Sequence, residues 1–124
     1  MLKPMLTAAA LALFSIPLTA QTPAASAAGG DETMTATVVD VSCYSTMGAT
    51  GAGHKACAQT CAHSGSPLAL MVNGVIYMPV SPKPNNPQNA RLVEFAEGKV
   101  KVTGTVKEVS GMHTIVIKSI EAAT

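Results

Sequence analysis

The sequence predicts a mainly β protein: a five-stranded Greek-key barrel with one short helix inserted after the first strand and another between the third and fourth strands. Short apolar stretches, several of them alternating with polar residues, recur between residues 33 and 120, as expected for strands around one core. The pair Asn73-Gly74 separates two of these stretches, which is typical of a tight β-hairpin. Segment 54–63 is instead rich in alanine, which favours a helix.

The first predicted strand covers residues 33–43. Its alternation places Cys43 on the same face as the two valines that precede it, at positions 39 and 41. If those valines face the core, Cys43 lies at the inward end of the strand. Residues 44–53 are rich in Gly, Ser and Thr and predict a loop, and the short helix over 54–63 follows.

Two apolar stretches, 68–72 and 75–80, predict the second and third strands on either side of the hairpin turn. Residues 81–87 contain three prolines and predict a loop. Segment 89–97 places apolar residues beside charged ones and predicts one or two helical turns that end at Gly98.

The clearest strand covers residues 99–107, where three valines alternate with lysines and threonines. Gly104 falls on the inner face of this strand, at a point where a barrel strand must bend. Ser110-Gly111 predicts a turn, and residues 112–120 predict the last strand.

This order of elements, over residues 33–121, resembles the OB-fold, a small Greek-key barrel that carries a helix before its fourth strand. A β-sandwich would have similar strands but would not need that helix. Among OB-folds, the chain resembles small barrels that bacteria export to the periplasm.

The N-terminus has the pattern of a secretory signal peptide. Lys3 is followed by an apolar run over 5–16, which is too short to span a bilayer, and Pro17 ends the run. No second apolar span follows, so we expect no integral membrane segment after cleavage and a periplasmic or secreted protein. The predicted organisation is a signal peptide over 1–20 (cleavage as late as 27), a flexible lead-in over 21–32 and one domain over 33–124.

Composition and the absence of certain motifs argue against two classes of function, nucleic-acid binding and catalysis. Removal of Lys3 with the signal peptide leaves equal numbers of basic and acidic residues, and only 3% of the chain is aromatic. Nucleic-acid binding needs a basic surface or stacking aromatics, so we expect none. The sequence also lacks a nucleophile elbow, paired carboxylates beside a histidine and a glycine-rich phosphate loop, so we expect no enzymatic activity.

All three cysteines and two of the three histidines lie between residues 43 and 63. Helical periodicity places His54, Cys57 and Cys61 within an arc of roughly 60° on one face. Cys43 is the fourth donor, which makes a Cys3His set suited to Zn(II) or Cu(I). Reserve ligands in the same segment are His63 and Met47.

A structural disulfide is the alternative. An exported protein meets oxidising conditions, so Cys43 could pair with Cys57 or Cys61 and staple the insert to the barrel. The protein would then be a binding module for a protein or a small ligand, without metal. The third cysteine would stay unpaired within the chain.

The exported barrels that this chain resembles include copper chaperones of efflux systems and the haem chaperone of cytochrome c maturation. The resemblance implies a fold and a compartment but no ligand residues, since the copper chaperones use His, Met and Trp, and this chain has no Trp. The chain also resembles uncharacterised secreted bacterial proteins with a Gly-His-x-x-Cys-Ala-x-x-Cys segment, here Gly53 to Cys61. The expected partner of a metal-binding barrel is a periplasmic metal-delivery or receptor protein.

Overall fold

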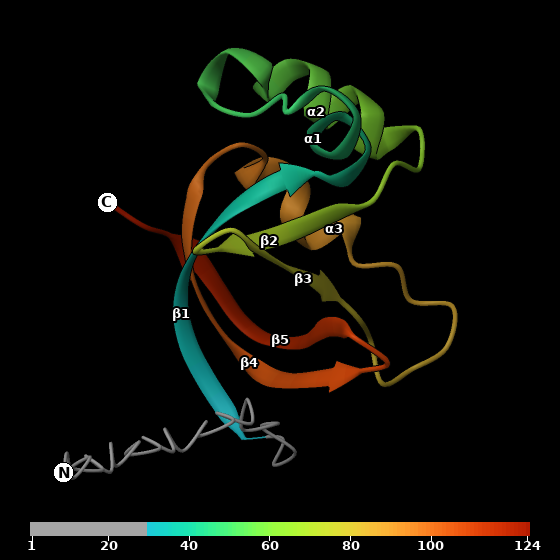
Figure 1. Ribbon diagram of the computed structural model, residues 1–124, viewed down its shortest axis with the longest axis vertical. Helices are drawn as coiled ribbons and strands as arrows, with labels where there is room; N and C mark the ends of the chain where they lie inside the picture. Colours follow the sequence, from blue (N-terminus) through green and yellow to red (C-terminus); the bar gives the residue numbers. More distant parts are fainter. Residues whose placement is uncertain (1–29) are drawn as a thin grey trace, which may run out of the picture.

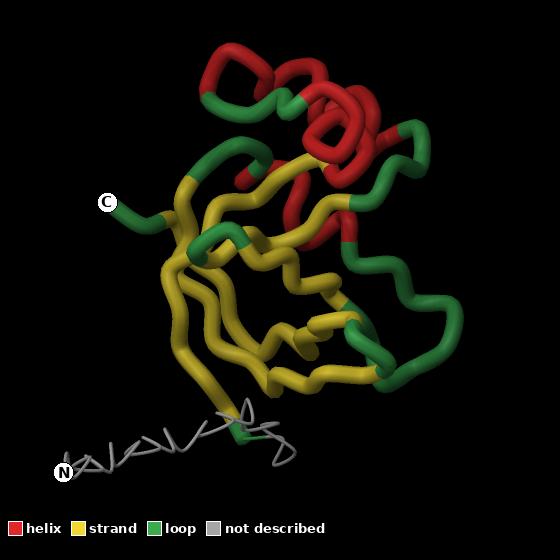
Figure 2. Tube along the Cα trace, viewed as in Figure 1, coloured by secondary structure: helices red, strands yellow, loops and turns green. Residues whose placement is uncertain are grey.

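The computed structural model describes residues 30–124, which form a five-stranded mixed sheet closed into a ring, with short helices gathered at one end (Figure 1; Figure 2). The predicted signal peptide and most of the lead-in lie outside the described residues. Within 30–124, no helix has the length and apolar character needed to cross a membrane. The strands are β1 (Asp31–Asp40), β2 (Leu68–Val72), β3 (Val75–Pro79), β4 (Lys99–Val109) and β5 (Met112–Ala122). The helices are α1 (Val41–Met47), η1 (Ala52–His54), α2 (Lys55–His63), α3 (Asn89–Leu92) and η2 (Val93–Phe95).

The strands follow one another around the ring in the order β1-β2-β3-β5-β4. Neighbours pair antiparallel except β3 and β5, which run parallel. The long strand β1 pairs through its second half with β2 and through its first half with β4. Every described strand therefore pairs with a neighbour on both edges over at least part of its length, which closes the ring. The predictions of a mainly β chain and of five strands are confirmed.

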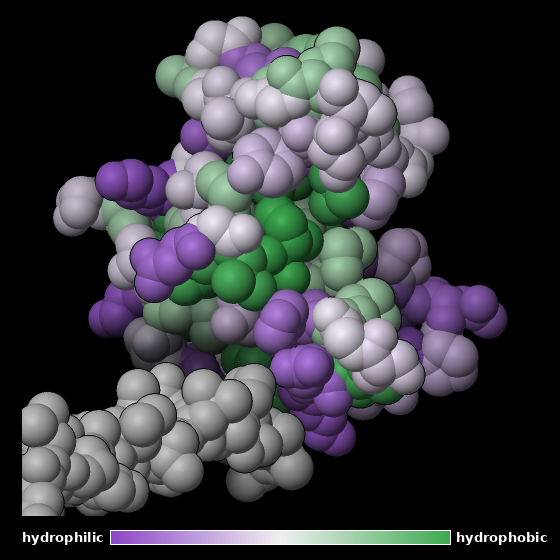
Figure 3. All heavy atoms as spheres, viewed as in Figure 1, coloured by the Kyte–Doolittle hydropathy of each residue, from purple (hydrophilic) through white to green (hydrophobic). Residues whose placement is uncertain are grey.

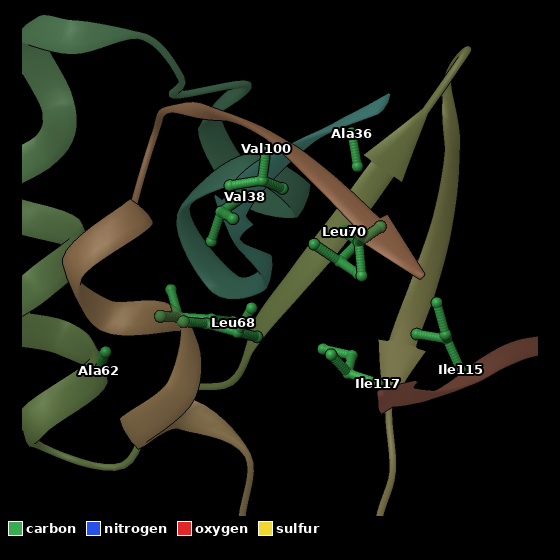
Figure 4. Close-up of a cluster of buried hydrophobic side chains, with 10 residues drawn as sticks. Ala36, Val38, Ala62, Leu68, Leu70, Val100, Ile115 and Ile117 are labelled. Carbon is green, nitrogen blue, oxygen red and sulfur yellow. The ribbon is translucent and has the colours of Figure 1, made fainter. Parts of the chain in front are cut away.

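Aliphatic side chains fill the inside of the ring (Figure 4). Val38, Leu70 and Val100 come from three different strands and are fully buried. The two helical segments that the sequence predicted outside the ring also contribute, Ala62 from α2 and Leu92 from α3. Burial of such side chains is worth about 1.5–3 kcal/mol each for the larger ones, so this cluster holds the helices onto the ring.

The β4–β5 ladder contains the bend predicted at Gly104. A register irregularity lies between Thr103 and Gly104, and Gly104 is buried. A Cβ atom added to Gly104 would lie 2.4 Å from the carbonyl oxygen of Val116 and 2.9 Å from Cγ1 of Ile115. The strands approach too closely here for any side chain, which explains why the residue is glycine.

The end of β1 differs from the prediction. The strand ends at Asp40, and Val41–Met47 forms helix α1, where we predicted further strand and then loop. Cys43 is therefore a helical residue and does not lie at the inward end of a strand. The Asp40 side chain caps the helix, because its Oδ1 accepts hydrogen bonds from the backbone N–H groups of Ser42 and Cys43. The Asp40 cap starts a helix at a point where the alternation of apolar and polar residues predicted a longer strand.

Asn89, the first residue of α3, joins three segments around the helical end of the ring. Its side-chain oxygen accepts a hydrogen bond of 3.0 Å from the Leu68 N–H at the start of β2. Its amide nitrogen donates to the carbonyl oxygens of Ala62 at 3.2 Å and Ser66 at 2.7 Å. One side chain thus satisfies the C-terminal end of α2 and the chain that leads into β2.

We expect Asn89→Ala to lower the free energy of unfolding by about 1–3 kcal/mol, because it removes the Asn89 partner of the Leu68 N–H and of the Ser66 carbonyl oxygen and leaves the Ala62 carbonyl oxygen with its bond from the Gly65 N–H alone. Urea denaturation followed by circular dichroism measures the change. Asn86→Ala is the matched control, since the Asn86 side chain bonds only to the Ser81 hydroxyl within an exposed loop. Equal stability of the two variants would contradict the role given to Asn89.

Candidate metal centre

The helices α1, η1 and α2 form a cap over one end of the ring (Figure 1). This cap has little apolar core of its own. Neither α1 nor η1 buries any residue, and α2 buries only Ala58 and Ala62. In the view of Figure 3, the most apolar surface lies over the ring, whereas the cap is covered mainly by residues of weak or intermediate hydropathy. Packing of apolar side chains therefore contributes little to holding the cap together.

The four predicted donors all lie in the cap. Cys43 is in α1, His54 ends η1, and Cys57 and Cys61 lie one turn apart in α2. Helix α1 ends at Gly48, which adopts a left-handed conformation (φ 64°) and whose N–H bonds back to carbonyl oxygens of the helix. The chain can therefore reverse between α1 and η1 and bring α2 alongside α1.

Cys43, His54 and Cys57 converge on one point. One ligand atom from each of the three lies within 4.8 Å of the others. Donors held about 2.3 Å from a tetrahedral metal ion would lie roughly 3.8 Å apart, so only a small contraction separates this arrangement from a coordination shell. Cys57 is exposed and the other two residues are half-buried, so the point lies near the surface of the cap.

The orientation of His54 is set by Glu97, a residue that our sequence reasoning did not select. Glu97 follows η2, and its side chain is 0% exposed. His54 Nδ1 lies 3.0 Å from Glu97 Oε1, while Oε2 accepts hydrogen bonds from the Thr50 hydroxyl at 2.9 Å and the Gly51 N–H at 2.8 Å. Because the carboxylate occupies Nδ1, the ring nitrogen left for a metal is Nε2.

His54 Nε2 is buried and has no hydrogen-bond partner among the described residues. A buried polar nitrogen without a partner costs free energy, so such atoms are uncommon in folded proteins. A carboxylate that holds one nitrogen of an imidazole while the other stays free is the usual support of a histidine ligand. Held in this way by Glu97, His54 could hold a metal ion through Nε2.

A second group of donors shares Cys43. One ligand atom from each of Asp40, Cys43 and Cys61 lies within 4.8 Å of the others. Asp40 is 0% exposed, and its Oδ1 accepts a hydrogen bond of 3.0 Å from the Ser66 hydroxyl in addition to the two that cap α1. Its Oδ2 is buried and has no hydrogen-bond partner. Asp40 is the second residue near the cysteines that the sequence reasoning missed, although a carboxylate just before a helix is a recognisable capping signal.

The surroundings favour thiols over thiolates. Burial raises the pKa of the Cys43 thiol, and the negative charge of Asp40 raises it further. Burial raises the pKa of Cys61 to about 11, with contributions from Asp40 and Cys57. Burial would raise the pKa of Asp40, but hydrogen bonds, chiefly from the Cys43 N–H and the Ser66 hydroxyl, hold it below its usual value. A metal ion must displace the thiol protons to bind here.

The two reserve ligands lie apart from these groups. Met47, at the end of α1, is 70% exposed. His63, at the end of α2, is exposed and belongs to neither group of converging donors. All three cysteines are unpaired. Comparisons with protein-family models, with curated proteins and with solved structures found no match.

Proposed function

We propose that this protein binds a soft transition-metal ion, Zn(II) or Cu(I), in its helical cap. The observation that carries the proposal is the convergence of Cys43, His54 and Cys57 within 4.8 Å, with the free nitrogen of His54 buried and unpartnered. Cys61, one helical turn after Cys57, lies within 4.8 Å of Cys43 but outside the group that contains His54, and we propose it as the fourth donor of this Cys3His site. Thiolate and imidazole donors suit Zn(II), and thiolates also suit Cu(I).

Charge supports a cation at this place. Asp40 and the side chain of Glu97 are both 0% exposed; Asp40 lies near Cys43 and Cys61, and Glu97 contacts His54. Among residues 30–124, no Lys or Arg forms an ion pair with either carboxylate. Buried negative charges without a cationic partner are costly, and a metal ion bound by thiolates beside them offsets that cost.

The small core of the cap supports the same proposal. Because α1 and η1 bury no residue, they gain little from packing onto the ring. A metal ion that joins α1 through Cys43, η1 through His54 and α2 through Cys57 would cross-link all three helices. Small domains with little core commonly rely on such a metal.

The compartment and fold belong to the proposal as well. We infer an exported protein, periplasmic or secreted, from the signal-peptide pattern of the first 20 residues. We also assign the closed ring to the OB-fold, since it has five strands, a parallel closure and a helix before its fourth strand. The exposed Cys57 would let a metal-delivery or receptor protein reach the ion and exchange ligands with it.

Metal analysis tests the proposal directly. The mature protein, purified without chelators under anaerobic conditions, should contain zinc or copper by elemental analysis, or take it up with high affinity when titrated. A protein that is metal-free and binds neither ion in competition with a chromophoric chelator would refute the proposal.

A disulfide-stapled binding module is the second candidate. The Cys43 sulfur lies within 4.8 Å of both the Cys57 and the Cys61 sulfur, so a small movement would allow either bond. Intact-mass measurement with and without reduction distinguishes this candidate from the first. A complete disulfide at Cys43 in protein isolated from its own compartment would favour the staple over the metal.

The support of His54 by Glu97 leads to a measurable prediction. Glu97→Gln should lower the affinity for Zn(II) by about 10–100-fold, the usual cost of losing an outer-shell carboxylate, because the amide no longer fixes the imidazole as firmly. Chelator competition measures the affinity. Glu94→Gln, at an exposed position three residues earlier, is the matched control and should bind as the unmodified protein does. Unchanged affinity in Glu97→Gln would show that His54 is not a ligand.

A further inference from the structure

The second group of donors combines Cys43 and Cys61 with Asp40, a buried carboxylate that a single ion in the Cys3His site does not use. Its three ligand atoms are as close together as those of the first group, all within 4.8 Å. Asp40 Oδ2 is buried without a hydrogen-bond partner. This oxygen and His54 Nε2 are the two such side-chain atoms among the described residues, and the two residues belong to different groups.

Asp40 is held firmly in place. Its Oδ1 accepts hydrogen bonds from Ser42 N–H at 2.9 Å, Cys43 N–H at 3.2 Å and the Ser66 hydroxyl at 3.0 Å. Three donors on one oxygen fix the carboxylate plane and leave the other oxygen free. A ligand whose orientation is set by its own hydrogen bonds loses little entropy when it binds a metal.

Charge balance distinguishes one ion from two. The three cysteines as thiolates and the Asp40 carboxylate carry four negative charges, and His54 is a neutral donor. One divalent ion bound by all three thiolates leaves two of these charges uncompensated in a partly buried place, whereas two divalent ions cancel all four and leave only Glu97, beside His54, outside the balance. Since partly buried, uncompensated charge is unfavourable, the donor set is balanced for a pair of ions.

We propose that the cap binds two Zn(II) ions that share Cys43 as a bridging ligand. The first ion is held by Cys43, His54 and Cys57, and the second by Asp40, Cys43 and Cys61. This inference rests on the proposed function and extends it: Cys61 completes the site when one ion is present and serves the second position when both are. The carboxylate makes the second position a zinc site, because Zn(II) accepts oxygen donors and Cu(I) prefers sulfur.

Stoichiometry tests the inference. The reduced protein is loaded with excess Zn(II), passed over a desalting column and examined by native mass spectrometry together with zinc and protein quantification. We expect two zinc ions per chain in the unmodified protein and one in Asp40→Asn. Asparagine can still cap α1 and accept the Ser66 hydrogen bond, so the helix is preserved. Cys61→Ala should also bind one ion, and this second variant tests the same position if Asp40→Asn folds poorly.

Asp31→Asn is the matched control and should bind two ions, because Asp31 lies on β1 far along the strand from the cap and pairs with Lys118. One zinc ion per chain in the unmodified protein would overturn the inference and leave the proposed function intact. Two ions in both Asp40→Asn and Cys61→Ala would also overturn it, since the second ion would then lie elsewhere. No zinc at all would overturn the inference, and failure to bind Cu(I) as well would refute the proposed function itself.

Discussion

Cys43→Ala is expected to abolish metal binding by the cap. Cys43 is the one residue that belongs to both groups of converging donors, so its removal takes a ligand from each. The loss in Zn(II) affinity should exceed the roughly 10–100-fold that loss of an outer-shell partner costs, because a coordinating atom is removed. Competition with a chromophoric chelator measures the affinity, and native mass spectrometry measures the number of ions.

The control for this prediction lies on the same helix. Thr46→Ala changes an exposed residue of α1 whose hydroxyl bonds only to the Ser42 carbonyl oxygen within the helix. This variant should bind zinc as the unmodified protein does. The strand signal in circular dichroism should be retained in Cys43→Ala, since the ring does not depend on the cysteine. A Cys43→Ala protein that retains full zinc affinity would exclude both sites.

The second large effect is on stability. Gly104→Ala should lower the free energy of unfolding by about 3 kcal/mol or more, at the upper end of the range for overpacked cores. The added Cβ would lie 2.4 Å from a backbone oxygen of β5, and backbone cannot move aside as a flexible side chain can. For a domain of this size, 3 kcal/mol corresponds to a fall in Tm of roughly 12–24 °C, measurable by thermal denaturation.

Gly53→Ala is the matched control for this substitution. A Cβ at Gly53 meets no atom within 4 Å, and its φ does not lie in the left-handed region. Its Tm should therefore stay within a few degrees of the unmodified protein. Equal stability of Gly104→Ala and Gly53→Ala would contradict the close approach of β4 and β5 at the register irregularity.

Local patterns were sufficient to predict the ring strands. The hairpin formed at Asn73-Gly74, where both residues adopt positive φ (49° and 79°), as such a turn requires. The alternating valines of 99–107 became β4, and Gly104 lies at its irregularity. The helices over 54–63 and 89–97 also formed close to their predicted bounds. These features depend on residues close together in the chain, so they can be predicted from short stretches of sequence.

The end of β1 could not be predicted from alternation. Residues 39–43 alternate as a strand does, yet the chain turns into a helix after Asp40. Long-range contacts reinforce the local Asp40 cap, since the Val41 N–H bonds to the Pro67 carbonyl oxygen and the Asp40 side chain bonds to Ser66. Both partners lie more than 20 residues away, so no local pattern reports them.

The sequence by itself determined which side chains could serve as soft ligands, because cysteine and histidine are rare in this chain and gather in one segment. Only the tertiary structure decided how these donors are grouped and which carboxylates support them. Glu97 reaches His54 from 43 residues away, across the cap, and Asp40 came beside Cys61 only because α2 folds back over the end of β1. Asp40 and Glu97 differ from the other acidic residues in their burial and hydrogen bonding, which depend on how the whole chain folds.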